Sequence, residues 1–148
     1  MRLRLVVYVL TAAIAGVLVG VPASSAQRLS PSITGHPILS GTLRGSSVYP
    51  AIRGGVGFGP FTKTEQDRHF SLSLRNAPGK LTGKLLTVFA AGHKLGFMRV
   101  GSQGTAQLVR YQSKGQYVPR LQSGDHVRVR NRFGTTLIAS CTLHPRLV

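Results

Sequence analysis

Strict alternation of apolar and polar residues in short segments is the feature that most limits how this chain can fold. In residues 69–76, the apolar residues Phe70, Leu72 and Leu74 are separated from one another by single polar residues. Successive side chains of a β-strand point to opposite faces of its sheet, so this period of two predicts a strand with one buried and one exposed face.

Further short apolar segments are separated by residues that favour turns. We predict strands at residues 38–45, 69–76, 85–91, 95–100, 105–111, 126–130 and 135–143. Asn131-Arg132-Phe133-Gly134 fits a hairpin connection between the last two of them. The sequence therefore predicts an all-β fold, a single antiparallel sandwich or barrel of about seven to eight short strands.

One segment also fits a helix. Leu81, Leu85, Val88 and Phe89 form an apolar stripe at helical spacing, and Gly92 is placed as a helix stop. The internal glycine at position 83 and the β-branched residues of this segment favour a strand instead. The strand is the preferred interpretation, and the helix remains open as the alternative.

The start of the chain has the layout of a secretory signal. Arg2 and Arg4 precede an uncharged apolar run at residues 5–21, and small residues lead to Ala26. We predict a signal peptide at residues 1–26 that is cleaved after Ala26, and export to the periplasm, the cell envelope or the extracellular space. A retained membrane anchor is the alternative, because the run approaches the ~20 residues that span a bilayer.

After the leader, residues 27–37 contain two prolines, a glycine and several hydroxyl residues, which predicts a flexible lead-in to a domain at residues 38–148. The whole chain carries a formal net charge of +16. Loss of Arg2 and Arg4 with the leader leaves 17 Lys and Arg against three acids, or +14. Such a surplus favours negatively charged partners, here an anionic polymer or membrane surface. Nucleic acid fits an exported protein less well.

The clearest cluster of cations lies near the end of the chain. Val127 and Val129 alternate with Arg128 and Arg130, which predicts a strand with an arginine-bearing outer face. The planar guanidinium group can bind phosphate or carboxylate through two hydrogen bonds. The candidate anion-binding residues are Arg128, Arg130, Arg132, Arg99, Arg110, Lys114 and Arg120. The alternative is a solvated face that keeps the sheet soluble and blocks edge pairing.

Residues 46–64 are rich in glycine and poor in periodic apolar residues. We predict a long loop there, with room for a short strand inside it. Long loops in compact domains are often functional. This supports an alternative function, in which the domain is a secreted protein-binding module or inhibitor that acts through the Gly-rich loop.

Catalytic and metal-binding patterns are weak. Cys141 is the single cysteine, so no internal disulfide can form, and its place in an alternating strand predicts a buried thiol. A hydrolase that uses Cys141, His144 and Asp125 is the third hypothesis, and the predicted burial of the thiol argues against it. Asp125 follows Gly124, where its side chain is expected to close a turn on the backbone. The five histidines show no metal-ligand spacing. We expect no metal, no cofactor and no enzymatic activity.

The C-terminal half has a recurrent pattern of turn and core residues. It includes Gly92-His93-Lys94-Leu95-Gly96, Gly104-Thr105-Ala106-Gln107-Leu108 and the segment VPRLQSGDHVRV at residues 118–129. This pattern resembles uncharacterised secreted all-β domains of bacteria, which approach a late hairpin through a similar segment. The resemblance implies a sandwich-like fold and a location in the envelope or outside the cell, and it implies no catalytic residues.

Overall fold

The computed structural model describes residues 38–60 and 68–146, and the predicted leader at 1–26 and lead-in at 27–37 lie outside them. Nine β-strands and two short 3₁₀ turns, η2 (Gly79–Leu81) and η3 (Gln112–Lys114), make up the described fold. The strands are β1 (Ile38–Gly45), β2 (Arg53–Pro60), β3 (Arg68–Arg75), β4 (Leu85–Ala90), β5 (His93–Arg99), β6 (Ala106–Tyr111), β7 (His126–Asn131), β8 (Leu137–Thr142) and β9 (His144–Arg146). Within these ranges there is no α-helix, and hence no helix with the length and apolar character needed to cross a membrane.

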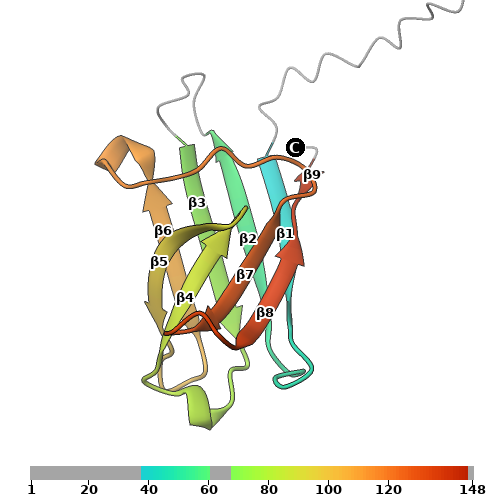
Figure 1. Ribbon diagram of the computed structural model, residues 1–148, viewed down its shortest axis with the longest axis vertical. Helices are drawn as coiled ribbons and strands as arrows, with labels where there is room; N and C mark the ends of the chain where they lie inside the picture. Colours follow the sequence, from blue (N-terminus) through green and yellow to red (C-terminus); the bar gives the residue numbers. More distant parts are fainter. Residues whose placement is uncertain (1–37, 61–67, 147–148) are drawn as a thin grey trace, which may run out of the picture. The chain divides into compact units, whose positions relative to one another are not determined.

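The strands form one antiparallel sheet in the order β5-β4-β7-β8-β1-β2-β3-β6, and β9 pairs with the start of β1. The two edge strands, β5 and β6, contact each other, so the sheet curls into a nearly closed barrel (Figure 1). The all-β prediction is confirmed, and the architecture is barrel-like. All seven strands predicted from the sequence are present, with ends that differ by a few residues.

The interior of the barrel is filled by the apolar residues of the alternating strands. Phe70, Leu72 and Leu74 of β3 are each at most 2% exposed, and Val127 and Val129 of β7 are fully buried. The segment between η3 and β7 crosses the upper end of the barrel in Figure 1 and buries Val118 and Leu121. The period of two therefore located the core correctly.

The predicted Gly-rich loop at residues 46–64 is wrong over most of its described length. Residues 53–60 form β2, which pairs with β1 on one side and β3 on the other. Glycine is required in this strand at Gly54, where a Cβ would collide with the backbone oxygen of Ser73. The close approach of two backbones explains why a central strand carries glycines that look like loop residues. Only residues 46–52 form a turn, and 61–64 lie outside the described residues.

The helical alternative for residues 81–89 is also wrong. Leu85–Ala90 forms β4, which pairs with both β5 and β7. Only one 3₁₀ turn at η2 precedes it.

The pairing of β8 with β7 is irregular, because its register shifts between Val129 and Arg130. This shift places Ile138, which is 1% exposed, in the core beside Ala139.

Candidate anion-binding surface

The outer face of β7 carries arginines, as the alternation predicts. Arg128 is exposed and Arg130 is half-buried, while the valines on either side of Arg128 point into the core. Arg130 Nη1 donates a hydrogen bond of 2.8 Å to the backbone oxygen of Gly134. This contact fixes one edge of the Arg130 guanidinium group against the β7–β8 hairpin.

The strand register places Arg128 in a row that crosses most of the sheet. Residues that are direct partners on neighbouring antiparallel strands project from the same face of the sheet. From β5 to β3, the successive partners are Lys94, Phe89, Arg128, Ser140, Arg44, Arg53 and Arg75. None of the seven is buried. We call its five charged members, Lys94, Arg128, Arg44, Arg53 and Arg75, the cation row.

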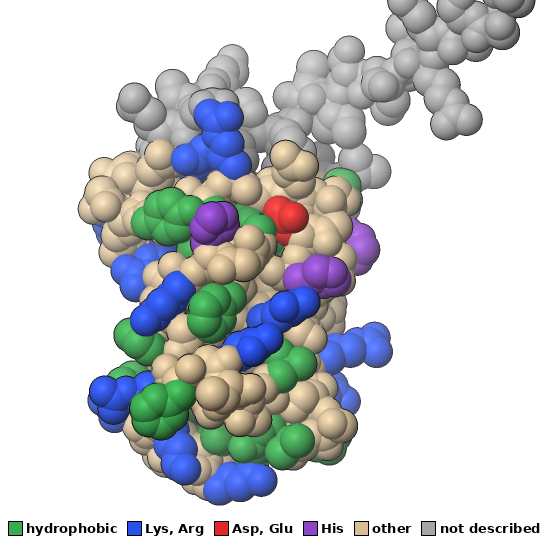
Figure 2. Space-filling view, in the orientation of Figure 1, with side chains coloured by type: hydrophobic (Ala, Val, Ile, Leu, Met, Phe, Trp, Pro, Cys, Tyr) green, Lys and Arg blue, Asp and Glu red, His purple; other side chains and the backbone are tan. Residues whose placement is uncertain are grey.

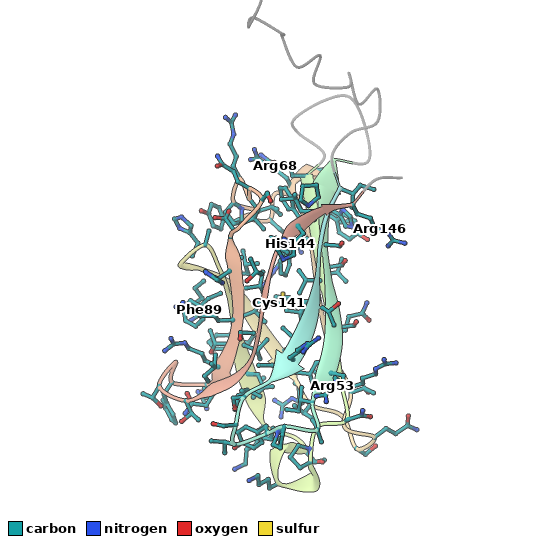
Figure 3. The ribbon with its side chains drawn as sticks, turned by 90° about the vertical axis from the view of Figure 1, so that its right-hand side faces the viewer. Arg53, Arg68, Phe89, Cys141, His144 and Arg146 are labelled. Carbon is teal, nitrogen blue, oxygen red and sulfur yellow. The ribbon has the colours of Figure 1, made fainter. Side chains whose placement is uncertain are left out.

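The cation row winds around the outside of the barrel. Its five members lie on β5, β7, β1, β2 and β3, which fall within seven neighbouring strands of the sheet. Strands are about 4.8 Å apart, so the row spans roughly 29 Å across the sheet. Figure 3 shows Phe89 and Arg53 on different sides of the barrel, as a winding row requires. On the face shown in Figure 2, Lys and Arg side chains are spread over the surface, with hydrophobic side chains between them. A linear ligand that crosses the strands would therefore meet positive charge repeatedly.

Charge in this part of the chain is almost entirely positive. Of the 19 Lys and Arg residues, only Arg2, Arg4, Arg28 and Lys63 fall outside the described residues. Asp125 is the one Asp or Glu within residues 38–60 and 68–146. Its Oδ2 accepts a hydrogen bond of 2.7 Å from the backbone N–H of Gln122, which confirms the predicted turn closure. The described Lys and Arg residues therefore greatly outnumber Asp125, the one described acidic side chain that could pair with them.

Four of the predicted anion-binding residues line two hollows on the surface. One, of about 590 Å³, lies along β4 and β7 and is lined by Phe89, Arg128 and Arg130. The other, of about 510 Å³, is lined by Lys84, Arg99 and Arg132. Arg99 Nη1 donates to the backbone oxygen of Gly83 at 2.8 Å, which fixes the guanidinium group at the rim.

Two further hollows contain arginines that sequence analysis did not select. Arg44 and Arg53 line one of about 490 Å³, beside the turn between β1 and β2. Arg75 lines another of about 630 Å³ together with Arg99. Each of these four hollows thus presents at least two cations. The Gly-rich composition of residues 46–64 predicts a loop instead of the strand β2. The pairing of Arg53 with Arg44 and Arg75 could therefore not be predicted from the sequence.

The remaining predicted residues lie elsewhere. Lys114 and Arg120 follow β6, whose arrow points to the upper end of the barrel in Figure 1, whereas Arg99 ends β5, whose arrow points to the lower end. Lys114 Nζ lies 4.7 Å from the centre of the Tyr111 ring. The structure therefore brings Arg128 and Arg130 together in one hollow and Arg99 and Arg132 together in another, and neither hollow is lined by Lys114 or Arg120.

Arg110 is placed differently from the other candidates. It pairs with Phe70, which is fully buried, so it belongs to the inward-facing side of β6. A Cβ on Gly96 of β5 would collide with the Arg110 guanidinium group, so this glycine leaves the space that Arg110 fills at the contact of β5 and β6. The Nε atom of Arg110 is buried without a hydrogen-bond partner. Arg110 is thus part of the closure of the barrel rather than of its outer face.

The residues of the hydrolase hypothesis do not form an activated nucleophile. Cys141 is 9% exposed and lies inside the barrel (Figure 3), as predicted. Burial raises the pKa of its thiol to about 11, whereas a reactive cysteine needs a thiolate at neutral pH. His144 is exposed on β9. The described residues contain no group of three His, Cys, Asp or Glu side chains that could hold a metal ion.

No family model matches the chain, and no curated protein matches it.

Proposed function

We propose that the chain is an exported, non-enzymatic β domain of the cell envelope or extracellular space that binds anionic polymers or surfaces through the cation row. The observation that carries this proposal is the register itself, which aligns Lys94, Arg128, Arg44, Arg53 and Arg75 on one outward-facing row. The predicted leader and the resemblance to secreted domains support export.

The arginines that face one another on paired strands support a negatively charged ligand, because their mutual repulsion destabilises the sheet when no anion is bound. Like charges directly opposite each other on paired strands destabilise a sheet. Arg44 faces Arg53, and Arg53 faces Arg75. An anionic polymer would remove this repulsion, and its binding would release condensed counterions to the solvent. Guanidinium groups would add two-pronged hydrogen bonds to phosphate, sulfate or carboxylate groups.

The alternative of a protein-binding module has lost most of its structural basis. It depended on a free Gly-rich loop at 46–64, and residues 53–60 are paired on both sides. Within the described part of the predicted loop, the short turn at 46–52 remains for such a partner, and Val48 in this turn is 57% exposed.

Chromatography of the domain on immobilised heparin and on phosphocellulose tests the proposed function. We expect the domain to be retained on both columns at low salt, and its retention to fall steeply as the salt concentration increases. The variant Arg44→Gln/Arg128→Gln removes two members of the cation row, and Lys80→Gln/Arg146→Gln removes the same charge elsewhere. The first should elute at clearly lower salt than the second. Passage of the unchanged protein through both columns at low salt would reject the proposal.

A further inference from the structure

A second row of side chains lies next to the cation row on the same outer face. Two residues along each strand from Arg44, Arg53 and Arg75, the direct partners are Thr42, Gly55 and Ser73, and Ser73 in turn pairs with Gln107 of β6. Thr42, Ser73 and Gln107 are exposed, and Gly55 is half-buried. We call these four residues the polar row. Two residues of a strand cover about 6.8 Å, so charged and neutral polar groups lie roughly that far apart.

The hollow of about 630 Å³ joins the two rows. Its polar lining comprises Arg75 of the cation row, Ser73 and Gln107 of the polar row, and Arg99 and Thr105 from nearby. It therefore combines two guanidinium groups with two hydroxyls and an amide in one hollow. Among the described residues that line it, none is aromatic.

Gly55 keeps this hollow open. A Cβ on Gly55 would meet nothing closer than the Ser73 side-chain oxygen at 4.0 Å, so packing within the domain does not require glycine there. Gly55 is also absent from the residues with positive φ, so the backbone conformation does not require it either. A larger side chain at position 55 would fit the barrel and would fill the floor of the hollow.

We propose that this hollow binds an acidic sugar unit of a polysaccharide. Arg75 and Arg99 receive the carboxylate or sulfate, and Ser73, Thr105 and Gln107 exchange hydrogen bonds with the ring hydroxyls. The inference rests on the proposed function, because it names the polymer that the cation row binds. Hydroxyl and amide groups both donate and accept hydrogen bonds, which suits a ligand that carries many hydroxyls.

The composition of the hollow favours a sugar over other polyanions. Single-stranded nucleic acids are bound largely by stacking of bases on aromatic side chains, and this hollow offers none. A simple polyphosphate has acceptor oxygens alone, so it can bind the arginines and the donor groups of Ser73, Thr105 and Gln107, but it cannot donate to the oxygens of these side chains. Sugar hydroxyls both donate and accept, so they can use these oxygens as well. The neutral polar residues therefore offer an acidic polysaccharide hydrogen bonds that a polymer of acceptor groups alone cannot make.

Removal of the neutral polar groups tests the inference without a change of charge. Affinity for polygalacturonate and for inorganic polyphosphate is measured by titration at one salt concentration. The variant Ser73→Ala/Gln107→Ala loses the hydrogen bonds of two side chains to the ring hydroxyls, so we expect polygalacturonate to bind at least tenfold more weakly. Polyphosphate can use only the donor groups of these two side chains, so its affinity should fall by a clearly smaller factor than that of polygalacturonate. The matched control, Ser123→Ala/Gln122→Ala, changes the same residue types at exposed positions outside the hollow and should bind both polymers normally.

A second variant blocks the hollow instead of removing its hydrogen bonds. Gly55→Val suits a strand and should fold with unchanged or higher thermal stability, and it should weaken polygalacturonate binding while polyphosphate binding persists. Equal loss for both polymers in the double-alanine variant, or no loss for polygalacturonate, would overturn the sugar assignment and leave the cation row as a general polyanion site. Failure of the unchanged protein to bind either polymer would instead reject the proposed function itself.

Discussion

Arg53 of β2 lies directly opposite Arg75 of β3, and both side chains are exposed. On its other side, Arg53 faces Arg44 of β1. Arg53 Nη1 donates to the backbone oxygen of Ile52 at 2.8 Å, which turns its guanidinium group toward the preceding turn. Three like charges thus occupy neighbouring positions on three paired strands, an arrangement that sheet stability alone disfavours.

The first prediction follows from this repulsion. Arg75→Thr replaces a charge with a β-branched residue that suits a strand, so we expect Tm to rise by about 2–4 °C at low salt. The gain should shrink at 0.5 M salt, where exposed charges are screened. Thermal unfolding followed by circular dichroism at the two salt concentrations checks this. A lower Tm at low salt would mean that Arg75 makes a stabilising contact.

Adjacent glycines in β2 should respond in opposite ways to alanine. Gly54→Ala should destabilise the domain by about 1–3 kcal/mol, because its Cβ would collide with the Ser73 backbone oxygen. Gly55→Ala should be neutral or slightly stabilising, because the space beside it is open and alanine reduces the freedom of the unfolded chain. Urea unfolding of the two variants gives the comparison. Equal losses at the two positions would contradict the register of β2 with β3.

The buried thiol gives a prediction about pH. Burial raises the pKa of Cys141 from 9.0 to about 11, so the folded state holds the proton more tightly than the unfolded state. The stabilisation from Cys141 is complete below pH 9 and is lost as the pH rises towards 11. In Cys141→Ala, the free energy of unfolding should therefore fall less steeply over this range. The native protein should also react slowly with thiol reagents at pH 8, and rapid modification there would contradict the burial of the thiol.

Arg110 and Arg128 form a matched pair of single-charge changes. Arg110→Ala removes the guanidinium group that fills the space beside Gly96, so Tm should fall. Arg128→Ala, on the outer face of β7, should lower the salt concentration at which the domain leaves heparin and change Tm little. Heparin elution and thermal unfolding of both variants separate the two roles. Weaker retention for Arg110→Ala than for Arg128→Ala would place the binding surface at the barrel closure instead.

Local pattern predicted much of the fold. The alternation in β3 and β7 identified the core residues Phe70, Leu72, Leu74, Val127 and Val129, because a period of two depends only on neighbouring residues. It failed where non-local contacts decide the outcome. Gly54 is a strand residue because another backbone comes close to it, and Ile138 is buried because the ladder between β7 and β8 shifts.

The candidate site was predicted less completely for the same reason. Arg128 and Arg130 belong to one strand and could be recognised from its alternation. Arg44, Arg53 and Arg75 are distant in sequence and become neighbours only through pairing of β1, β2 and β3. Arg110 looked equivalent to Arg128, yet its inward side of β6 follows from its register with Phe70. Strand order and register, which composition does not encode, therefore determined which cations share a surface.

The salt dependence of heparin affinity in a cation-row variant tests the central claim most directly. Binding is titrated at several salt concentrations for the unchanged protein, for Arg44→Gln/Arg75→Gln and for the control Lys80→Gln/Arg146→Gln. If the row contacts the polymer, the slope of log affinity against log salt should become shallower by roughly 1.4–1.8 in the row variant, close to that expected for two lost contacts, and change little in the control. Equal slopes for the two variants would show that the aligned cations bind no polymer and that the charge acts only in bulk.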